Sequence, residues 1–192
     1  MIKIDFKDKD SSDFESGTSA EEIIKKTYGR KSGAVAISIE GNEYDLSHRI
    51  VNNCKINLIK DDSDEGLYIL RHSCAHLLAQ AVTELFPDAK PTIGPPVDDG
   101  FYYDFYMDPI NEDDLRNIEK KMRELVKKNI AIIREEHDNK TLRKMFSKNQ
   151  FKIEIMDDKI GQDISSSAYR QDNFVDLCKG PHVSRTSKLQ WF

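Results

Sequence analysis

Two pairs of residues, far apart in the sequence, have the types and spacing that could do chemistry. His72 and His76 are four residues apart in a stretch that predicts a helix, and side chains at that spacing lie on one helix face. Cys178 and His182 have the same spacing around Gly180-Pro181, a dipeptide that predicts a turn. Together the four side chains can hold one metal, one water or one ligand.

The chemistry of this set has more than one interpretation. Zinc binds imidazole and thiolate, so three histidines and one cysteine are an acceptable ligand set. Without a metal, histidines position or deprotonate water, and a cysteine beside them binds or reacts. The glutamate of the His-Glu-x-x-His zinc proteases and the pattern of the zinc deaminases are both absent. Either pair alone could also be ordinary core residues.

Composition limits the class of protein. The chain has 192 residues, 33% charged and 38% hydrophobic, which suits one large or two small folded domains. It lacks both the apolar run of about 20 residues that spans a bilayer and the apolar core of a signal peptide, so we expect a cytoplasmic protein without a membrane partner. A net charge of −5 argues against non-specific coating of nucleic acid but not against local contact with a few nucleotides.

The first sixty residues alternate strand signals with one helix. Alternating apolar residues predict strands at 2–6 and 54–59, and a hairpin over 34–46 with Gly41-Asn42 as its two-residue turn. A capping box predicts that a helix begins at 18–22. This order of elements predicts a small β-grasp module.

An acidic run at 61–66 predicts the boundary between domains, because like charges repel and stay solvated. We therefore expect one domain over 1–62 and a second over 63–192. The elements expected in the second domain are a helix over about 67–86, a proline-rich loop over 87–100, an aromatic strand over 101–106, a helix opening at 111–114, a strand at 131–136, a short helix at 141–148, a strand at 151–155 and a polar stretch over 157–173.

Three separated segments carry a resemblance to a known family. They are Arg71–Leu78, Ile93-Gly94-Pro95 with Gly100–Asp104, and Val175–Val183. In this order they resemble the N-terminal region of the bacterial type of threonyl-tRNA synthetase, and the similarity covers nearly the whole chain. It implies an α+β protein: a ubiquitin-like (β-grasp) TGS domain, then a larger α+β editing domain, related to that of alanyl-tRNA synthetase, with a long helix against an antiparallel sheet.

The resemblance implies an aminoacyl-tRNA deacylase that hydrolyses serine wrongly esterified to threonine tRNA, giving serine and free tRNA. A pocket built for threonine rejects serine poorly, because a missing methyl is worth only about 1–3 kcal/mol. The implied partners are threonine tRNA, with the seryl ester on its 3′-terminal adenosine, and the remaining synthetase domains. Since no aminoacylation core follows Phe192, we expect a fragment that does not itself activate threonine.

Carried over by motif, the resemblance also implies the site residues. His72 or Cys178, with Lys152, would orient a water onto the ester carbonyl, assisted by a ribose hydroxyl. Asp176 would recognise the seryl amine, and Tyr103 would lie against the terminal adenosine. The implied catalytic residues are His72, His76, Lys152, Cys178 and His182, and the implied substrate-binding residues are Tyr103 and Asp176.

The resemblance leaves alternatives. The alanine-specific relatives use this constellation to bind zinc, whereas the threonine family implies a site that requires no cofactor; the zinc ligands would be His72, His76, Cys178 and His182. A catalytically inactive module that binds RNA or the ribosome, and a free-standing trans-editing protein, are the rival functions. Lys179 stands where arginine is usual, which preserves the charge but not a bidentate contact.

Overall fold

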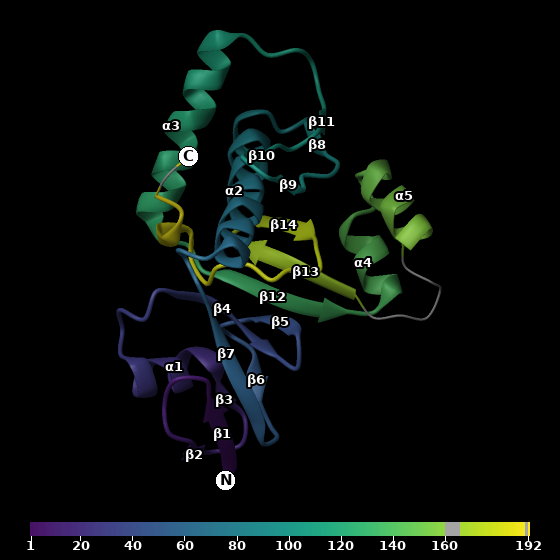
Figure 1. The fold of residues 1–192 in the computed structure, drawn as a ribbon. Coiled ribbons are helices and arrows are strands. Elements are labelled where there is room, and N and C mark those ends of the chain that lie inside the picture. The colour runs from purple at the N-terminus through teal and green to yellow at the C-terminus, as the bar shows by residue number, and fades with distance from the viewer. Residues whose placement is uncertain (160–165, 191) are drawn as a thin grey trace. The chain divides into compact units, whose positions relative to one another are not determined.

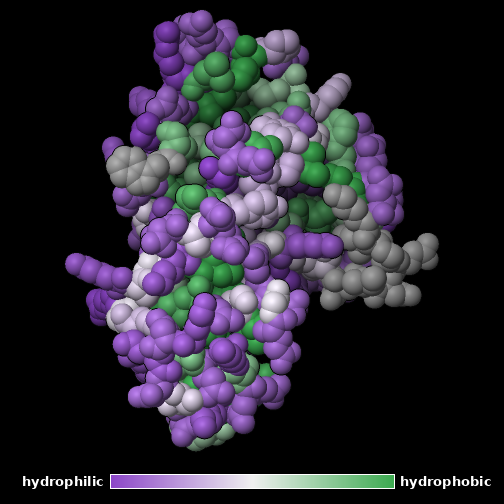
Figure 2. All heavy atoms as spheres, in the orientation of Figure 1, coloured by the Kyte–Doolittle hydropathy of each residue, from purple (hydrophilic) through white to green (hydrophobic). Residues whose placement is uncertain are grey.

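The computed structural model describes residues 1–159, 166–190 and 192 and shows a mixed α+β protein (Figure 1). Its contacts divide it into a first unit, Met1–Leu70 with Gly180–Ser184, and a second unit, Arg71–Lys179 with Arg185–Phe192. In the part of the chain that is described, no helix is both long enough and apolar enough to cross a membrane. Hydrophilic side chains dominate the face drawn in Figure 2.

The first unit is built on a five-stranded sheet with the order β2-β1-β7-β4-β5. β1 and β7 are parallel, and the other neighbours are antiparallel. Helix α1 packs its buried Ile23 and Ile24 into the core of the sheet. The elements are β1 (Ile2–Phe6), β2 (Ser12–Phe14), β3 (Thr18–Ser19), α1 (Ala20–Tyr28), β4 (Ala34–Ile39), β5 (Asn42–Asp45), β6 (Arg49–Ile50) and β7 (Cys54–Lys60), with β3 paired to β6.

Two local predictions for this unit have different outcomes. The capping box is confirmed, because Ser19 caps α1 and Glu22 bonds back to the Ser19 backbone. The turn predicted at Gly41-Asn42 is wrong by one residue, since Ile39 pairs with Asn42. The turn residues are Glu40 and Gly41, with φ of 50° and 81°, and a two-residue turn with positive φ at both positions favours glycine at the second.

The second unit contains the long helix α2, which begins in the first unit, and a three-stranded antiparallel sheet with the order β12-β13-β14. Its elements are α2 (Asp64–Leu85), β8 (Lys90–Pro91), β9 (Pro96–Val97), β10 (Gly100–Phe101), β11 (Phe105–Tyr106), α3 (Glu112–Lys128), β12 (Ile132–His137), α4 (Asn139–Met145), α5 (Gln150–Lys159), β13 (Ser166–Gln171), β14 (Phe174–Leu177) and a 3-10 turn (Thr186–Lys188).

The two faces of this sheet pack against different helices. Phe174 of β14 packs with Ala75 and Ala79 of α2, whereas Val175 and Leu177 join the core formed with α4 and α5. Because successive strand residues point to opposite faces, Asp176 shares the α2 side with Phe174. The alternation of β14 thus directs a carboxylate toward the helix that carries the histidines.

Several expected elements are confirmed and others are wrong. The helices at α2, α3 and α4 and the strand β12 are confirmed. The strand predicted at 151–155 is wrong, because these residues belong to α5. Its buried Lys152 and Met156 are four residues apart, as on one face of a helix. The short alternation of apolar residues at 151–155 also fits a strand, so it does not separate the two. Only the ends of the aromatic run 101–106 are strands, β10 and β11.

The polar stretch predicted over 157–173 also differs from the structure. It contains the end of α5 and the strand β13, whose residues Ser167, Ala168 and Tyr169 are buried. Residues 160–165 lie outside the described part of the chain. The sequence pattern did not predict β13, because its residues are small or polar. They are buried by packing on both faces of the sheet.

Candidate active site

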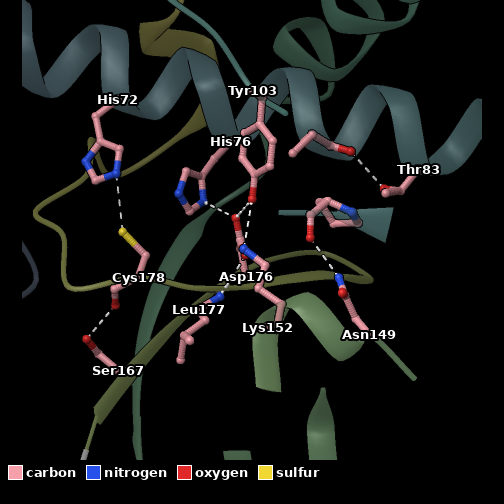
Figure 3. Close-up of polar contacts among 12 residues, drawn as sticks. His72, His76, Thr83, Tyr103, Asn149, Lys152, Ser167, Asp176, Leu177 and Cys178 are labelled. Atoms are coloured by element: carbon pink, nitrogen blue, oxygen red, sulfur yellow. Dashed lines mark hydrogen bonds and ion pairs between the residues drawn. The ribbon is translucent and has the colours of Figure 1, made fainter. Parts of the chain in front are cut away.

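Three elements of the second unit bring the candidate residues together. Helix α2 carries His72 and His76 one turn apart, and β14 and its C-terminal end carry Asp176 and Cys178 opposite them (Figure 3). Helix α5 supplies Lys152. The i, i+4 spacing on α2 and the i, i+2 spacing at β14 therefore place His72 beside Cys178 and His76 beside Asp176.

His72 and Cys178 form the more accessible pair. Nε2 of His72 lies 3.3 Å from Sγ of Cys178, and both residues are half-buried. The Cys178 backbone is held by Ser167, whose carbonyl accepts the Cys178 N–H at 3.1 Å and whose hydroxyl donates to the Cys178 carbonyl at 2.6 Å. An imidazole and a thiol this close can exchange a proton or hold a water between them.

A buried polar network surrounds Asp176. Nζ of Lys152 lies 2.5 Å from Oδ1 of Asp176, and the Tyr103 hydroxyl donates to Oδ2 at 2.5 Å. Lys152 also donates to the Tyr103 oxygen at 3.0 Å, and the Leu177 N–H donates to Oδ1 at 2.8 Å. Tyr103, Lys152 and Asp176 are only 8%, 3% and 1% exposed. A buried ion pair with its remaining lone pairs satisfied is the arrangement in which such a pair is tolerated.

Electrostatics keep the carboxylate charged and the phenol neutral. Burial alone would raise the pKa of Asp176, but Lys152, His76 and the hydrogen bonds lower that pKa overall. Burial, followed by the neighbouring Asp176 charge, holds the pKa of Tyr103 well above its usual value. Tyr103 therefore acts as a neutral hydrogen-bond donor to a fixed carboxylate.

His76 lies between the accessible pair and this network. Its ring meets that of His72 edge-on at 5.3 Å between centroids, and its Nδ1 is 3.6 Å from Oδ2 of Asp176. Burial lowers the pKa of His76 to about 3, although the Asp176 charge opposes that shift. His76 is therefore neutral near pH 7, and its contact with Asp176 is not an ion pair.

We expect the His76 ring to stay neutral from pH 8 down to pH 5, because its pKa in the folded protein lies well below the ordinary 6.5. The unfolded chain takes up this proton near pH 6.5 and the folded chain does not, so His76 contributes stability above that pH that is lost as the pH falls toward 3. NMR titration of the ring protons measures this directly. A His76 midpoint near pH 6 would contradict the assignment.

Six of the predicted site residues lie together in the second unit: His72, His76, Tyr103, Lys152, Asp176 and Cys178. His182 belongs to the first unit, where it is buried and its backbone N–H donates to Oδ1 of Asp45 at 2.7 Å. Sequence reasoning missed Ser167 as the partner of the Cys178 backbone, because its contact depends on the pairing of β13 with the end of β14. Gly94 belongs to the Ile93-Gly94-Pro95 motif, but no role for it was predicted.

The residues on α2 and near β14 fit a metal by their chemistry. The ligand atoms of His72, His76 and Cys178 lie within 4.8 Å of one another. His76 is neutral, as a metal ligand must be, and its Nδ1 lies toward a carboxylate, an arrangement common around metal-binding histidines. The set could therefore hold zinc, which binds nitrogen and sulfur ligands.

Comparisons with known proteins point to one group of enzymes. Residues 167–192 match the family described as the threonyl and alanyl tRNA synthetase second additional domain. The chain is 47% identical to a threonine–tRNA ligase of Thermoplasma acidophilum over 163 residues, 85% of this chain and 24% of the relative. It is 41% identical to that of Ehrlichia canis over 196 residues, 100% of this chain and 31% of the relative. With 44% identity, that of Alkalilimnicola ehrlichii matches over 176 residues, 90% of this chain and 27% of the relative.

The chain thus spans about a quarter to a third of the length of these curated relatives. The second additional domain match includes Asp176, Cys178 and His182. The chain is therefore related to threonine–tRNA ligases, and it matches the part of them that contains the second additional domain.

Proposed function

We propose that this chain hydrolyses the ester of serine on threonine tRNA and so removes a wrongly attached amino acid. The observation that carries the proposal is the His72–Cys178 pair, 3.3 Å apart, beside the buried network of Lys152, Asp176 and Tyr103. This arrangement lies in a chain related to threonine–tRNA ligases. Such enzymes need a second, hydrolytic site, because binding alone discriminates poorly against a substrate that lacks one methyl.

The proposed reaction is a water-mediated ester hydrolysis. His72 accepts a proton from a water held near Cys178 as the water oxygen attacks the ester carbonyl carbon. The bond between that carbon and the ribose oxygen breaks, and the proton passes to the ribose oxygen. The products are serine and tRNA with a free terminal hydroxyl. A positioned base of this kind contributes roughly 10²–10⁴-fold to a rate.

The buried network would bind and orient the substrate. Asp176 is the proposed partner of the seryl ammonium, which would join or replace the Lys152 ammonium already 2.5 Å from that carboxylate. Lys152 is proposed to help orient the water, and Tyr103 to lie against the terminal adenosine. His76 and His182 complete the proposed hydrolytic set of five residues, with His72, Lys152 and Cys178.

We propose a site that requires no cofactor, with zinc as the alternative. If zinc binds, its ligands are the imidazoles of His72, His76 and His182 and the thiolate of Cys178. Bound zinc would supply an activated water at neutral pH. In either case Lys152 keeps its proposed role in orienting the water, and Asp176 and Tyr103 keep theirs in substrate binding.

The first unit and the partners complete the proposal. The sheet order β2-β1-β7-β4-β5 with α1 packed on its core supports a β-grasp TGS domain over 1–62. The proposed partners are threonine tRNA and the remaining domains of a synthetase, and the proposed compartment is the cytoplasm. An inactive RNA-binding module would share this fold, and a free-standing trans-editing protein would share both fold and activity.

The test is hydrolysis of threonine tRNA charged with radiolabelled serine or threonine by the 192-residue chain. We expect serine to be released faster than in buffer and threonine to be retained. The same assay after chelator treatment and after zinc addition separates the two cofactor hypotheses, because a metal-free site keeps its rate under chelation. A zinc site loses its rate under chelation and recovers it with zinc.

A further inference from the structure

Gly94 lies unusually close to the ring of Tyr103. A Cβ atom at Gly94 would fall 2.3 Å from Cδ2 and 2.7 Å from Cγ of Tyr103, and 2.8 Å from the carbonyl oxygen of Tyr102. Atoms of packed side chains do not approach this closely, because contacts between carbons are optimal at about 3.5–4.0 Å. Only a residue without a side chain allows Tyr103 to occupy its position.

The backbone on both sides of this contact is fixed. The Thr92 N–H donates to the Asp104 carbonyl at 2.9 Å, and the Asp104 N–H donates to the Ile93 carbonyl at 2.9 Å. These bonds join the two residues before Gly94 to the residue after Tyr103. A methyl group at position 94 would therefore press on both the Tyr102 carbonyl oxygen and the Tyr103 ring, and because these bonds hold the backbone we expect the ring to move further.

The Tyr103 ring is also enclosed on its other sides. It lies 5.0 Å from the ring of Phe105, centroid to centroid, and packs in a core cluster with Ala75, Ala79 and Phe174. Because packed cores have few voids, pressure from position 94 displaces the whole side chain, including the hydroxyl that contacts both Asp176 and Lys152.

We infer that Gly94 is a positioning residue, which holds the Tyr103 hydroxyl where it links Asp176 to Lys152. Its contribution is the close approach that a missing Cβ permits. The side-chain atoms nearest to a Cβ at Gly94 belong to Tyr103, so we assign the effect of Gly94 to that side chain. The expected effect of Gly94 on hydrolysis rests on the proposed function. Its expected effect on the chemical labelling of Lys152 rests on the structure alone.

The first experiment measures hydrolysis of seryl-tRNA by Gly94→Ala in two backgrounds. A displacement of about 1 Å near a reacting centre can cost on the order of 10²-fold in rate, and we expect a loss of that order with Tyr103 present. In the Tyr103→Phe background the hydroxyl is already gone, so Gly94→Ala should cause no further loss. An equal loss in both backgrounds, or no loss in either, would overturn the inference.

The matched control is Gly100→Ala. A Cβ atom at Gly100 meets nothing within 4 Å, so this variant makes the same chemical change in open space. We expect it to keep the rate of the unmodified chain. A loss at Gly100 equal to that at Gly94 would show that the effect belongs to the loop and not to the contact with Tyr103.

A second readout does not depend on hydrolysis. Lys152 is 3% exposed, so an amine-reactive reagent should label it slowly, as measured by mass spectrometry. Gly94→Ala should raise the labelling of Lys152 several-fold, and Gly100→Ala should not. If the unmodified chain hydrolyses no seryl-tRNA, the proposed function fails while the labelling still decides the role of Gly94; unchanged labelling in Gly94→Ala overturns that role.

A further variant tests the same contact in the case that Gly94→Ala does not fold. If Gly94→Ala does not fold, the same change is made in the Tyr103→Ala background, which lacks the Cγ and Cδ2 atoms that the new methyl would meet. A cooperative thermal transition in the double variant supports a contact between position 94 and the ring. A double variant that stays unfolded while Tyr103→Ala alone folds contradicts it.

Discussion

Replacing Lys152 with methionine is expected to lower the free energy of unfolding by about 3–5 kcal/mol, the typical cost of removing one partner of a buried ion pair. Methionine has a similar length and no charge, so the change leaves the Asp176 carboxylate buried without its cationic partner, while the Tyr103 hydroxyl and the Leu177 N–H still donate to it. Urea unfolding at pH 7, followed by circular dichroism, measures the loss.

The control for this change is Lys148→Met, which removes the same charge from an exposed position. It should alter stability by no more than about 0.5 kcal/mol. Adding Asp176→Asn to Lys152→Met removes the uncompensated charge and should recover part of the loss. Equal stabilities for Lys152→Met and Lys148→Met would show that the pair is not buried in solution.

The loss from Lys152→Met should also depend on pH. Lys152 is the largest influence that lowers the pKa of Asp176, so without it the pKa of that buried carboxyl rises. The loss in free energy of unfolding caused by Lys152→Met is then largest above the raised pKa of Asp176. It becomes smaller as the pH falls through that pKa, because protonation removes the unpaired charge. A penalty that is constant from pH 7 to pH 4 would contradict this mechanism.

His72→Ala and Cys178→Ala should each slow hydrolysis of seryl-tRNA by on the order of 10²-fold or more, the size of the effect of a positioned acid or base. These half-buried side chains form the accessible part of the site. The loss should appear in single-turnover rates rather than in tRNA binding, since neither residue belongs to the network proposed to bind the substrate. Rapid-quench measurements at saturating enzyme separate the two quantities.

Controls of the same residue types lie elsewhere in the structure. His137 pairs with Glu135 on β12, and Cys54 begins β7 in the first unit; alanine at either should leave the rate unchanged. Unchanged rates for both His72→Ala and Cys178→Ala would remove these two residues from the reaction. A slower rate for only one of the two variants would show that this residue, and not the other, activates the attacking water.

Local sequence patterns predicted much of what positions the site. The long helix placed His72 and His76 on one face because i, i+4 spacing has a fixed geometry. The capping box predicted the start of α1 after Ser19, and α3 begins within the predicted 111–114, after its cap Asn111. Where a single short-range rule applied, the sequence was sufficient.

The buried network was less accessible to sequence reasoning. Lys152 was expected on a strand, because a buried lysine looks like a polar position in an alternating pattern; only its pairing with Asp176 explains its burial on α5. Leu85 and Leu115 fit the apolar spacing of α2 and α3, yet they are 37% and 56% exposed, so this spacing alone does not decide burial. The contact between Gly94 and Tyr103 depends on how two irregular segments pair, which no periodicity encodes.

The most direct test of the central claim is the ratio of hydrolysis rates for seryl-tRNA and threonyl-tRNA, measured on the same threonine tRNA with this chain. The account predicts that the serine ester is hydrolysed faster by at least the 10-fold or so that one methyl group can supply, and that His72→Ala abolishes the difference. Equal rates for the two esters, or no hydrolysis of the serine ester above buffer with or without zinc, would contradict it.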